Sequence, residues 1–359
     1  IRAGLERLSQ SDRPGVQALL ENAGIAGKAL TSTNVAFTLV PRINATGRMG
    51  APERAVRLLI SGYEEEAEVL SEEICADNEE RRRVEAEIAE AAFADIEAKG
   101  YMKDRVVVVD GENWHHGVIG IVASRVTERC GKPCMIISRG ETEAKGSGRS
   151  IEGFSLFEAI CACGDLLIKF GGHPMAAGIT LKPENIEAFR KRINQYVRTH
   201  CGDSAPVSSL EIDAALTRPS LITLQEVEEL SRLEPYGAGN NRPVFCLRGA
   251  RLESMQSVGQ NKHLKLRLQK GHTSFDGIFF SVTADECGVC AGMRVDAAFY
   301  LQVNEFRSQR SIQLQLIDLR PSLDPSGREN EALSLCRELI SGGTLSPRDA
   351  ARALPSRDQ

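Results

Sequence analysis

Apolar residues recur at helical spacing near the start of the chain. Leu5 and Leu8 fall on one face of a helix, and Val16, Leu19 and Leu20 repeat the spacing. Positions three and four apart share a face of an α-helix. We therefore predict that residues 1–62 form short helices joined by loops.

A much longer helix is predicted over residues 63–99. From Glu64 to Lys99 the chain contains neither proline nor glycine, and residues that favour helices dominate. The apolar residues gather near the two ends, whereas residues 77–83 are wholly polar. We expect a connecting helix that packs at both ends and is solvated in the middle, as in helices that bridge two domains.

Strand and helix patterns alternate in residues 100–200. Residues 105–110 and 133–138 are apolar runs typical of buried strands, and residues 118–130 between them have helical spacing. This order predicts a βαβ unit, so at least part of the sheet is parallel. Because ligands of such sheets bind at the carboxyl ends of the strands, we expect a ligand near the loop at residues 111–117.

The hydrophobic period changes to two after a polar linker at residues 201–209. Leucines alternate with polar side chains at residues 264–269, and aliphatic residues alternate with glutamine at residues 312–316. Glycines mark turns between such stretches. The pattern predicts a small antiparallel β-barrel with one basic face.

Composition and charge limit the class of protein and the cellular compartment. The 359 residues are 42% hydrophobic and 26% charged, as in globular proteins, and no apolar run is long enough to span a bilayer. We expect a cytoplasmic protein without a membrane anchor. The net charge is −5, but residues 63–98 hold fourteen Asp or Glu and three Arg, so the rest of the chain is net positive. Ten cysteines at irregular spacings favour reduced thiols, and no pair of them has a second pair at zinc-finger spacing.

The alternation of Lys145, Ser147 and Arg149 is the strongest chemical signal. On a strand these side chains share one face at intervals of about 6–7 Å. An ammonium, a hydroxyl and a guanidinium in a row suit the oxygens of a phosphodiester. Gly146 and Gly148 alternate with them, which indicates that something approaches the strand closely. The plainer alternative is an edge strand with solvated basic side chains.

A second cluster runs from Gly171 to Gly178 and leads into a predicted strand at residues 179–181. Its His173 has three open roles: donating to a phosphate oxygen, transferring a proton, or holding the loop. His115 and His116 do not supply the three or four ligands of a hydrolytic metal centre. The residues alone therefore predict phosphate binding without the groups that cleave a phosphodiester.

Six stretches match one known family, together and in the same order: residues 41–48, 114–125, 145–150, 171–178, 233–240 and 304–307. They resemble the RecJ family, single-strand-specific DNA exonucleases of the DHH phosphoesterase superfamily. The resemblance implies an α/β fold class: a remnant of the DHH domain at residues 1–62, the connecting helix at 63–99, a DHH-associated substrate-binding domain with a mixed sheet at 100–200, an antiparallel oligonucleotide-binding (OB) barrel at 205–322, and a tail at 323–359.

The same resemblance implies metal-dependent hydrolysis of single-stranded DNA from the 5′ end, releasing mononucleotides in DNA repair and recombination. The family holds Mn²⁺ or Mg²⁺ with Asp and His residues of the DHH domain, and the Asp-His-His triplet is absent from this sequence. We therefore expect no metal ligands in this chain, a fragment cut before Ile1, and no activity from the fragment alone. Protein partners are not implied.

Residue roles also follow from the resemblance. Lys145, Ser147 and Arg149 are expected to grip phosphates, while Asn44 and Arg48 meet the strand from the opposite wall. From the residues alone, the plainer alternative for Asn44 and Arg48 is a loop that precedes a helix and carries solvated arginines, and only the resemblance favours the functional role.

Close to the scissile group the resemblance places His173, as a catalytic candidate, with Gly172 and more weakly His115. His116 departs from the family pattern, which has proline there.

The barrel is expected to follow the single strand through Lys265, Arg267 and Arg307, mostly by charge. Two alternatives stay open. One is a non-catalytic module that binds single-stranded nucleic acid. The other is an oligoribonuclease or nucleotide phosphatase of the same superfamily, although such relatives generally lack the extra barrel.

Overall fold

The computed structural model describes residues 1–201, 209–306 and 309–322, and the chain divides into two units, Ile1–Leu210 and Glu211–Gln359. Arg307 and the predicted tail at residues 323–359 lie outside the described residues. Within the described part, no helix has both the length and the apolar content that crossing a bilayer requires.

Short helices form the start of the first unit, as their spacing predicted. Leu19, Leu20 and Leu58 pack in one core with Leu70 and Ile74 of a long sixth helix. The helices are α1 (Arg2–Ser9), α2 (Pro14–Asn22), α3 (Ser32–Asn34), α4 (Val40–Met49), α5 (Glu53–Ile60) and α6 (Glu64–Ala98).

Asn44 and Arg48 lie on a helix, α4, and not on the loop considered for this stretch. A π-helical turn at Val35–Leu39 leads directly into α4. Pro41 occupies the first turn of α4, where its missing N–H breaks no helical hydrogen bond. The prediction of a loop was wrong because this proline begins the helix.

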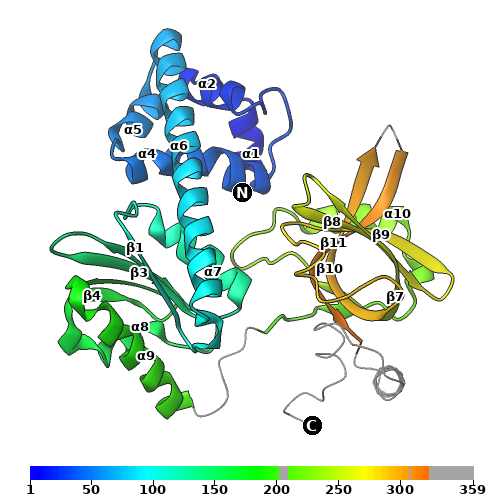
Figure 1. Ribbon diagram of the computed structural model, residues 1–359. Coiled ribbons are helices and arrows are strands. Elements are labelled where there is room, and N and C mark those ends of the chain that lie inside the picture. Colours follow the sequence, from blue (N-terminus) through cyan, green and yellow to red (C-terminus); the bar gives the residue numbers. More distant parts are fainter. Residues whose placement is uncertain (202–208, 307–308, 323–359) are drawn as a thin grey trace, which may run out of the picture. The chain divides into compact units, whose positions relative to one another are not determined.

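The connecting helix α6 is continuous over 35 residues, which corresponds to about 50 Å at about 1.5 Å per residue. Its first half packs on α2 and α4, and its second half packs on a β-sheet (Figure 1). The middle is not solvated throughout, contrary to the prediction, because Asn78 and Glu85 are buried. Arg125, from a later helix, places its Nε 2.7 Å from Glu85 Oε1, and Arg81 pairs with the same carboxylate.

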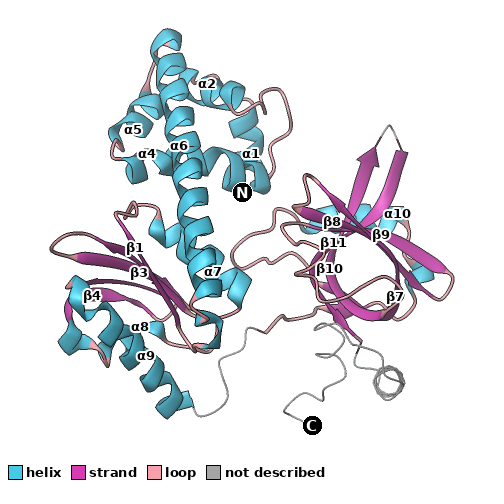
Figure 2. Cartoon of the chain, in the orientation of Figure 1, coloured by secondary structure: helices cyan, strands magenta, loops and turns pink. Residues whose placement is uncertain are grey.

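A five-stranded mixed sheet completes the first unit, with helices on both faces (Figure 2). Its elements are β1 (Val107–Glu112), α7 (Ile119–Cys130), β2 (Cys134–Arg139), β3 (Ala144–Arg149), α8 (Leu156–Cys161), β4 (Leu167–His173), β5 (Ala176–Leu181) and α9 (Ile186–Cys201). The strand order is β1-β2-β3-β5-β4, and only β1 and β2 are parallel. The βαβ prediction is confirmed as β1–α7–β2. Helices α6 and α7 cover one face, and α8 and α9 pack on the other.

The second unit contains a closed five-stranded barrel. Its elements are β6 (Ala214–Ala215), α10 (Leu224–Glu229), β7 (Phe245–Val258), β8 (His263–Lys270), β9 (Thr273–Phe279), β10 (Arg294–Phe306) and β11 (Gln309–Pro321). Barrel neighbours are antiparallel except β9 and β11, and the pairing of β10 with β7 closes the barrel. Leu264, Leu266 and Leu268 are buried inside. The predicted OB-type barrel is confirmed.

Raising the pH above 9 is expected to destabilise the first unit through Cys134. Burial raises the pKa of the Cys134 thiol to about 12 from an ordinary value of 9.0. Below pH 9 the thiol is protonated in both states. Between pH 9 and 12 only the unfolded state loses the proton. The free energy of unfolding therefore falls by about 1.4 kcal/mol per pH unit.

Urea unfolding of the full chain at pH 8 and pH 10.5, followed by fluorescence of the single tryptophan, checks this expectation. The Cys134→Ala variant should lose about 2 kcal/mol less than the parent between the two pH values. Equal losses in the two proteins would remove Cys134 as the cause.

Candidate nucleic-acid interface

Strand β3 presents its cationic side chains on the face that α7 partly covers. Lys145 is exposed and Ser147 and Arg149 are half-buried, whereas Gly146 and Gly148 are buried on the opposite face. A side chain added at Gly120, in the first turn of α7, would lie 3.0 Å from Ser147 Oγ and 3.2 Å from an Arg149 guanidinium nitrogen. Gly120 therefore gives these two side chains their space.

The glycines of β3 serve the protein core and not a ligand. A Cβ at Gly146 would lie 2.8 Å from Ile179 Cγ1, and a Cβ at Gly148 would lie 2.7 Å from Leu156 Cδ2. Both neighbours belong to the core beneath α8 and α9. The close approach that we predicted is real, but core side chains make it.

Cross-strand pairing extends the basic face over β5 and β4. Lys145 pairs with Thr180, which pairs with Lys169. Arg149 pairs with Ala176, which pairs with His173. Because side chains alternate along a strand, both rows lie on one face of the sheet.

Between the two rows lies a floor almost without side chains, formed by Ser147, Gly178 and Gly171. An added Cβ at Gly171 would meet nothing within 4 Å, and one at Gly178 would approach only Gly146 O, at 3.8 Å. Open space therefore lies directly over the backbone here. A hollow of about 410 Å³ includes this floor and is lined by His116, Ile119, Lys145, Gly146, Ser147, Lys169, Phe170, Gly171, Gly178, Ile179 and Thr180.

The charge of this hollow is uniformly positive. None of its lining residues is acidic. Within the described part of the chain, Lys145 and Lys169 have no ion pair. Arg149 does not line the hollow, and it donates from Nη1 to Gly148 O at 2.8 Å and to Ser147 Oγ at 3.3 Å. Unpaired ammonium groups beside exposed backbone favour an anionic ligand that lies flat on the sheet.

The Gly171–Gly178 cluster is a β-hairpin, β4–β5, and not a loop that precedes a strand. His173 ends β4 and is exposed, next to the turn at Pro174 and Met175. Gly172 has φ of +153°, and a Cβ there would lie 2.4 Å from Ala176 O. Gly172 is therefore required by the backbone of the hairpin.

The loop between β1 and α7 is tied to α4. Arg48 Nη1 donates to Gly117 O at 2.9 Å, and Gly117 N–H donates to Nδ1 of His115 at 3.2 Å. His115 thus shapes the loop. The exposed His116 lines the hollow, and its ring stacks on the His115 ring with centroids 5.4 Å apart. Asn44, one turn before Arg48, is exposed and does not line the hollow.

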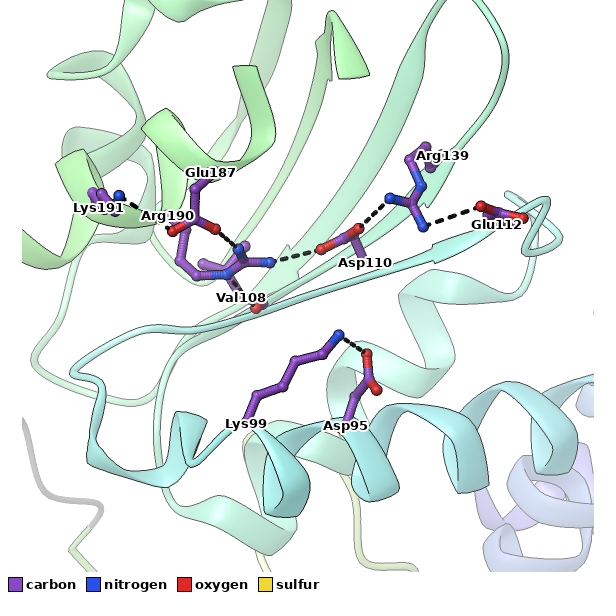
Figure 3. Close-up of polar contacts among 9 residues, drawn as sticks. All are labelled: Asp95, Lys99, Val108, Asp110, Glu112, Arg139, Glu187, Arg190 and Lys191. Atoms are coloured by element: carbon purple, nitrogen blue, oxygen red, sulfur yellow. Dashed lines mark hydrogen bonds and ion pairs between the residues drawn. The ribbon is translucent and has the colours of Figure 1, made fainter. Parts of the chain in front are cut away.

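Asp110, near the carboxyl end of β1, forms ion pairs with two arginines (Figure 3). Its carboxylate lies 2.6 Å from Arg190 Nη2 and 3.5 Å from Arg139 Nη1. Among all described residues, no three His, Cys, Asp or Glu side chains gather as a metal site would require. The arginine-paired Asp110 therefore does not belong to a set of metal ligands among the described residues.

Comparison with known proteins agrees with this architecture. Residues 103–199 match the family model described as the DHHA1 domain, and residues 212–318 match the one described as the RecJ OB domain. The chain is 34% identical over 319 residues to the single-stranded-DNA-specific exonuclease RecJ of Bacillus subtilis and 35% identical over 323 residues to that of Thermus thermophilus. This chain belongs to the RecJ family.

A solved RecJ structure shares the fold. The crystal structure of Thermus thermophilus RecJ in complex with Mn²⁺ matches with a TM-score of 0.74 and 32% identity, over 89% of this chain and 46% of that one. The match to Bacillus subtilis RecJ covers 88% of this chain and 40% of the relative, and that to Thermus thermophilus RecJ covers 89% and 44%. The chain thus spans about half the length, or less, of these RecJ relatives.

Two of the cations predicted to bind the strand, Lys265 and Arg267, lie in the described part of the RecJ OB barrel, and they differ in their ion pairs. Lys265 is exposed and has no ion pair within the described residues. Arg267 places Nε 3.2 Å from Glu253 Oε2 and Nη1 3.0 Å from Asp276 Oδ1. Arg267 is therefore neutralised by the barrel itself.

Three residues that line this hollow were not predicted as site residues: Lys169, Thr180 and His116. Lys169 precedes Gly171 by two residues, so strand alternation would have placed the two on one face. Nothing local indicates that β4 and β5 lie beside β3, because that pairing brings together distant segments.

Proposed function

We propose that this chain is the strand-binding part of a single-stranded-DNA-specific exonuclease of RecJ type, which degrades DNA from the 5′ end to mononucleotides in repair and recombination. The observation that carries the proposal is the glycine floor between two basic rows, all on one face of the DHHA1 sheet. The proposed compartment is the cytoplasm.

The residues of this chain position the substrate. Lys145 and Lys169 attract one phosphate, and Arg149 with Ser147 binds another through charge-assisted hydrogen bonds. The sugar passes over Gly178, where no side chain intervenes. His173, exposed at the hairpin turn, lies beside the Arg149 end and is the one candidate for a direct role near the scissile group.

Hydrolysis itself is assigned to Mn²⁺ or Mg²⁺, which would supply activated water in the complete enzyme. Two solved Thermus thermophilus RecJ structures are described as complexes with Mn²⁺ and with Mg²⁺. The proposal places the metal ligands outside this chain.

The structure changes the proposed roles of several residues. Arg48 and His115 hold the loop before α7, so we assign them to positioning, and Asn44 is retained only as a neighbour of Arg48. Lys265 keeps its proposed contact with the upstream strand. Arg307 keeps the same proposed contact, although it lies outside the described residues. Arg267 is reassigned to the barrel.

Replacing Lys145 with glutamine is expected to weaken binding of an oligodeoxythymidine about fivefold at 50 mM salt. The loss should be accompanied by a salt dependence that is shallower by about 0.7 in log Kd against log salt, the slope of one phosphate contact. Fluorescence anisotropy of a labelled oligonucleotide, titrated with the full chain, measures both quantities.

The matched control is Arg192→Gln. Arg192 lies on α9, on the other face of the sheet, and its Nη1 is 3.0 Å from Asp165 Oδ1. Its replacement should change neither affinity nor salt dependence. If both variants bind as weakly as each other, the basic face has no special role, and a parent chain that prefers duplex to single strand would refute the proposed substrate.

A further inference from the structure

The outer face of β8 is divided into two halves of different chemistry. Outward side chains alternate along β8 as His263, Lys265 and Arg267, between the buried leucines of the barrel core. Lys265 pairs across the sheet with Gln256 of β7 and Ile278 of β9, neither of which is charged. Only Lys265 carries charge among these three, so this half is weakly basic.

At the other half of the face the charges balance. Arg267 is shared between Glu253 and Asp276, at 3.2 Å and 3.0 Å. The next outward residue of β8, Gln269, pairs across the sheet with the exposed Arg251 of β7, so two cations stand against two carboxylates at this end. The excess positive charge of this face therefore lies at Lys265, toward His263.

An exposed aromatic side chain lies at the His263 end. Phe280 directly follows β9 and is 46% exposed. Its ring meets the His263 ring edge to face, with centroids 5.3 Å apart and planes at 78°. Such a geometry is favourable for aromatic pairs and leaves one face of a ring open.

His263 is held from two sides. His263 Nδ1 accepts a hydrogen bond from Ser281 N–H at 2.9 Å, and a Cβ added at Gly259 would lie 2.9 Å from His263 Cδ2. Ser281 has φ of +58°, an uncommon conformation for a residue with a side chain, which turns the chain immediately after Phe280. The His263 ring is therefore held by its neighbours, and the exposed Phe280 ring packs against it.

We propose that Phe280 and His263 form a stacking platform for one base of single-stranded nucleic acid, with Lys265 and the exposed Lys262 contacting the phosphates beside that base. Rigid aromatic rings next to unpaired cations are the means by which barrels of this topology bind bases without sequence readout. The platform rests on the proposed function only in taking single-stranded DNA as the ligand.

The test is a Phe280→Ala variant of the full chain, titrated onto two fluorescent 15-mers, one of deoxythymidine and one abasic with the same number of phosphates. Affinity for oligodeoxythymidine should fall about tenfold, which corresponds to about 1.4 kcal/mol. Affinity for the abasic strand and the salt dependence should not change, because no phosphate contact is lost.

Two further variants separate stacking from simple apolar contact. Phe280→Tyr keeps an aromatic ring and should bind as the parent does, whereas Phe280→Leu should lose most of what Phe280→Ala loses. The matched control is Leu221→Ala in the same unit, at a side chain that is 60% exposed, and it should leave affinity unchanged. Far-ultraviolet circular dichroism and thermal melting establish that each variant is folded.

A second measurement does not depend on any substitution. Oligodeoxythymidine with 5-iododeoxyuridine at successive positions should photocrosslink to the peptide that contains Phe280 or His263. Undiminished affinity of the folded Phe280→Ala variant, or crosslinks confined to other peptides of the barrel, would overturn the platform while leaving the proposed function intact. A parent chain that binds neither oligonucleotide would overturn both.

Discussion

Replacing Arg190 with methionine is expected to lower the free energy of unfolding of the first unit by about 3–5 kcal/mol. The side chains of Arg190 and Asp110 are 9% and 14% exposed, and their charged atoms lie 2.6 Å apart (Figure 3). Arg190 Nε also donates to Val108 O at 3.1 Å, and its guanidinium lies 4.8 Å from the centre of the Tyr101 ring. Methionine keeps much of the volume but leaves the Asp110 carboxylate with only Arg139, at 3.5 Å.

Equilibrium urea unfolding, followed by the fluorescence of Trp114, measures this loss. Trp114 is the only tryptophan in the chain and lies four residues after Asp110, so it reports on the first unit alone. Arg192→Met, on the same helix, is the control, because that side chain is 45% exposed and its ion pair with Asp165 is worth at most about 1 kcal/mol.

Adding Asp110→Asn to Arg190→Met should recover part of the lost stability, since much of the cost is a buried carboxylate without its main partner. A single-variant loss below about 1 kcal/mol would show that Asp110 remains solvated or adequately paired. The same result would make the cluster in Figure 3 an ordinary surface network.

Replacing Gly178 with valine is expected to weaken binding of single-stranded DNA by about 10- to 100-fold, which corresponds to about 1.4–2.8 kcal/mol. The valine side chain would occupy the open space over the floor between Lys145 and Arg149, where the sugar is proposed to pass. Gly178→Ala should give a smaller loss. Anisotropy titrations of the same labelled oligonucleotide rank the three proteins.

Stability should move in the opposite direction from affinity. Glycine inside a strand costs about 0.5–1 kcal/mol relative to alanine, and an added Cβ at Gly178 meets only Gly146 O, at 3.8 Å. Gly146→Ala is the matched contrast: its Cβ would lie 2.8 Å from Ile179 Cγ1, so it should destabilise the unit. Unchanged affinity in a folded Gly178→Val protein would remove the floor from the binding surface.

Much of the fold was predictable because its signals are local. The absence of proline and glycine from Glu64 to Lys99 predicted α6, and period-two alternation predicted β3 and β8. Alternation also predicted that Lys145, Ser147 and Arg149 share a face. Strand β3 has that burial pattern because the core requires every second residue to be small or apolar.

The rest depends on contacts between distant segments. Gly146 in a strand indicated that a ligand approaches closely. The group that lies close is instead the Ile179 side chain of β5, 33 positions later in the chain. Lys169 joins Lys145 only through the strand order β3-β5-β4, which no local pattern specifies. The buried Glu85 interrupts the solvated middle of α6 because its partner Arg125 lies 40 residues away.

The ion pair between Arg125 and Glu85 fixes the rotation of α6 about its own axis relative to the sheet. One residue added between Asn78 and Glu85 would turn one end by about 100° relative to the other and lengthen the helix by about 1.5 Å. Arg48, carried on the helices that pack against the first half of α6, could then no longer face Gly117 beside the sheet. A whole heptad would nearly restore the rotation, but it would lengthen the helix by about 10.5 Å and carry Arg48 away from Gly117, so both the phase and the length of α6 are constrained.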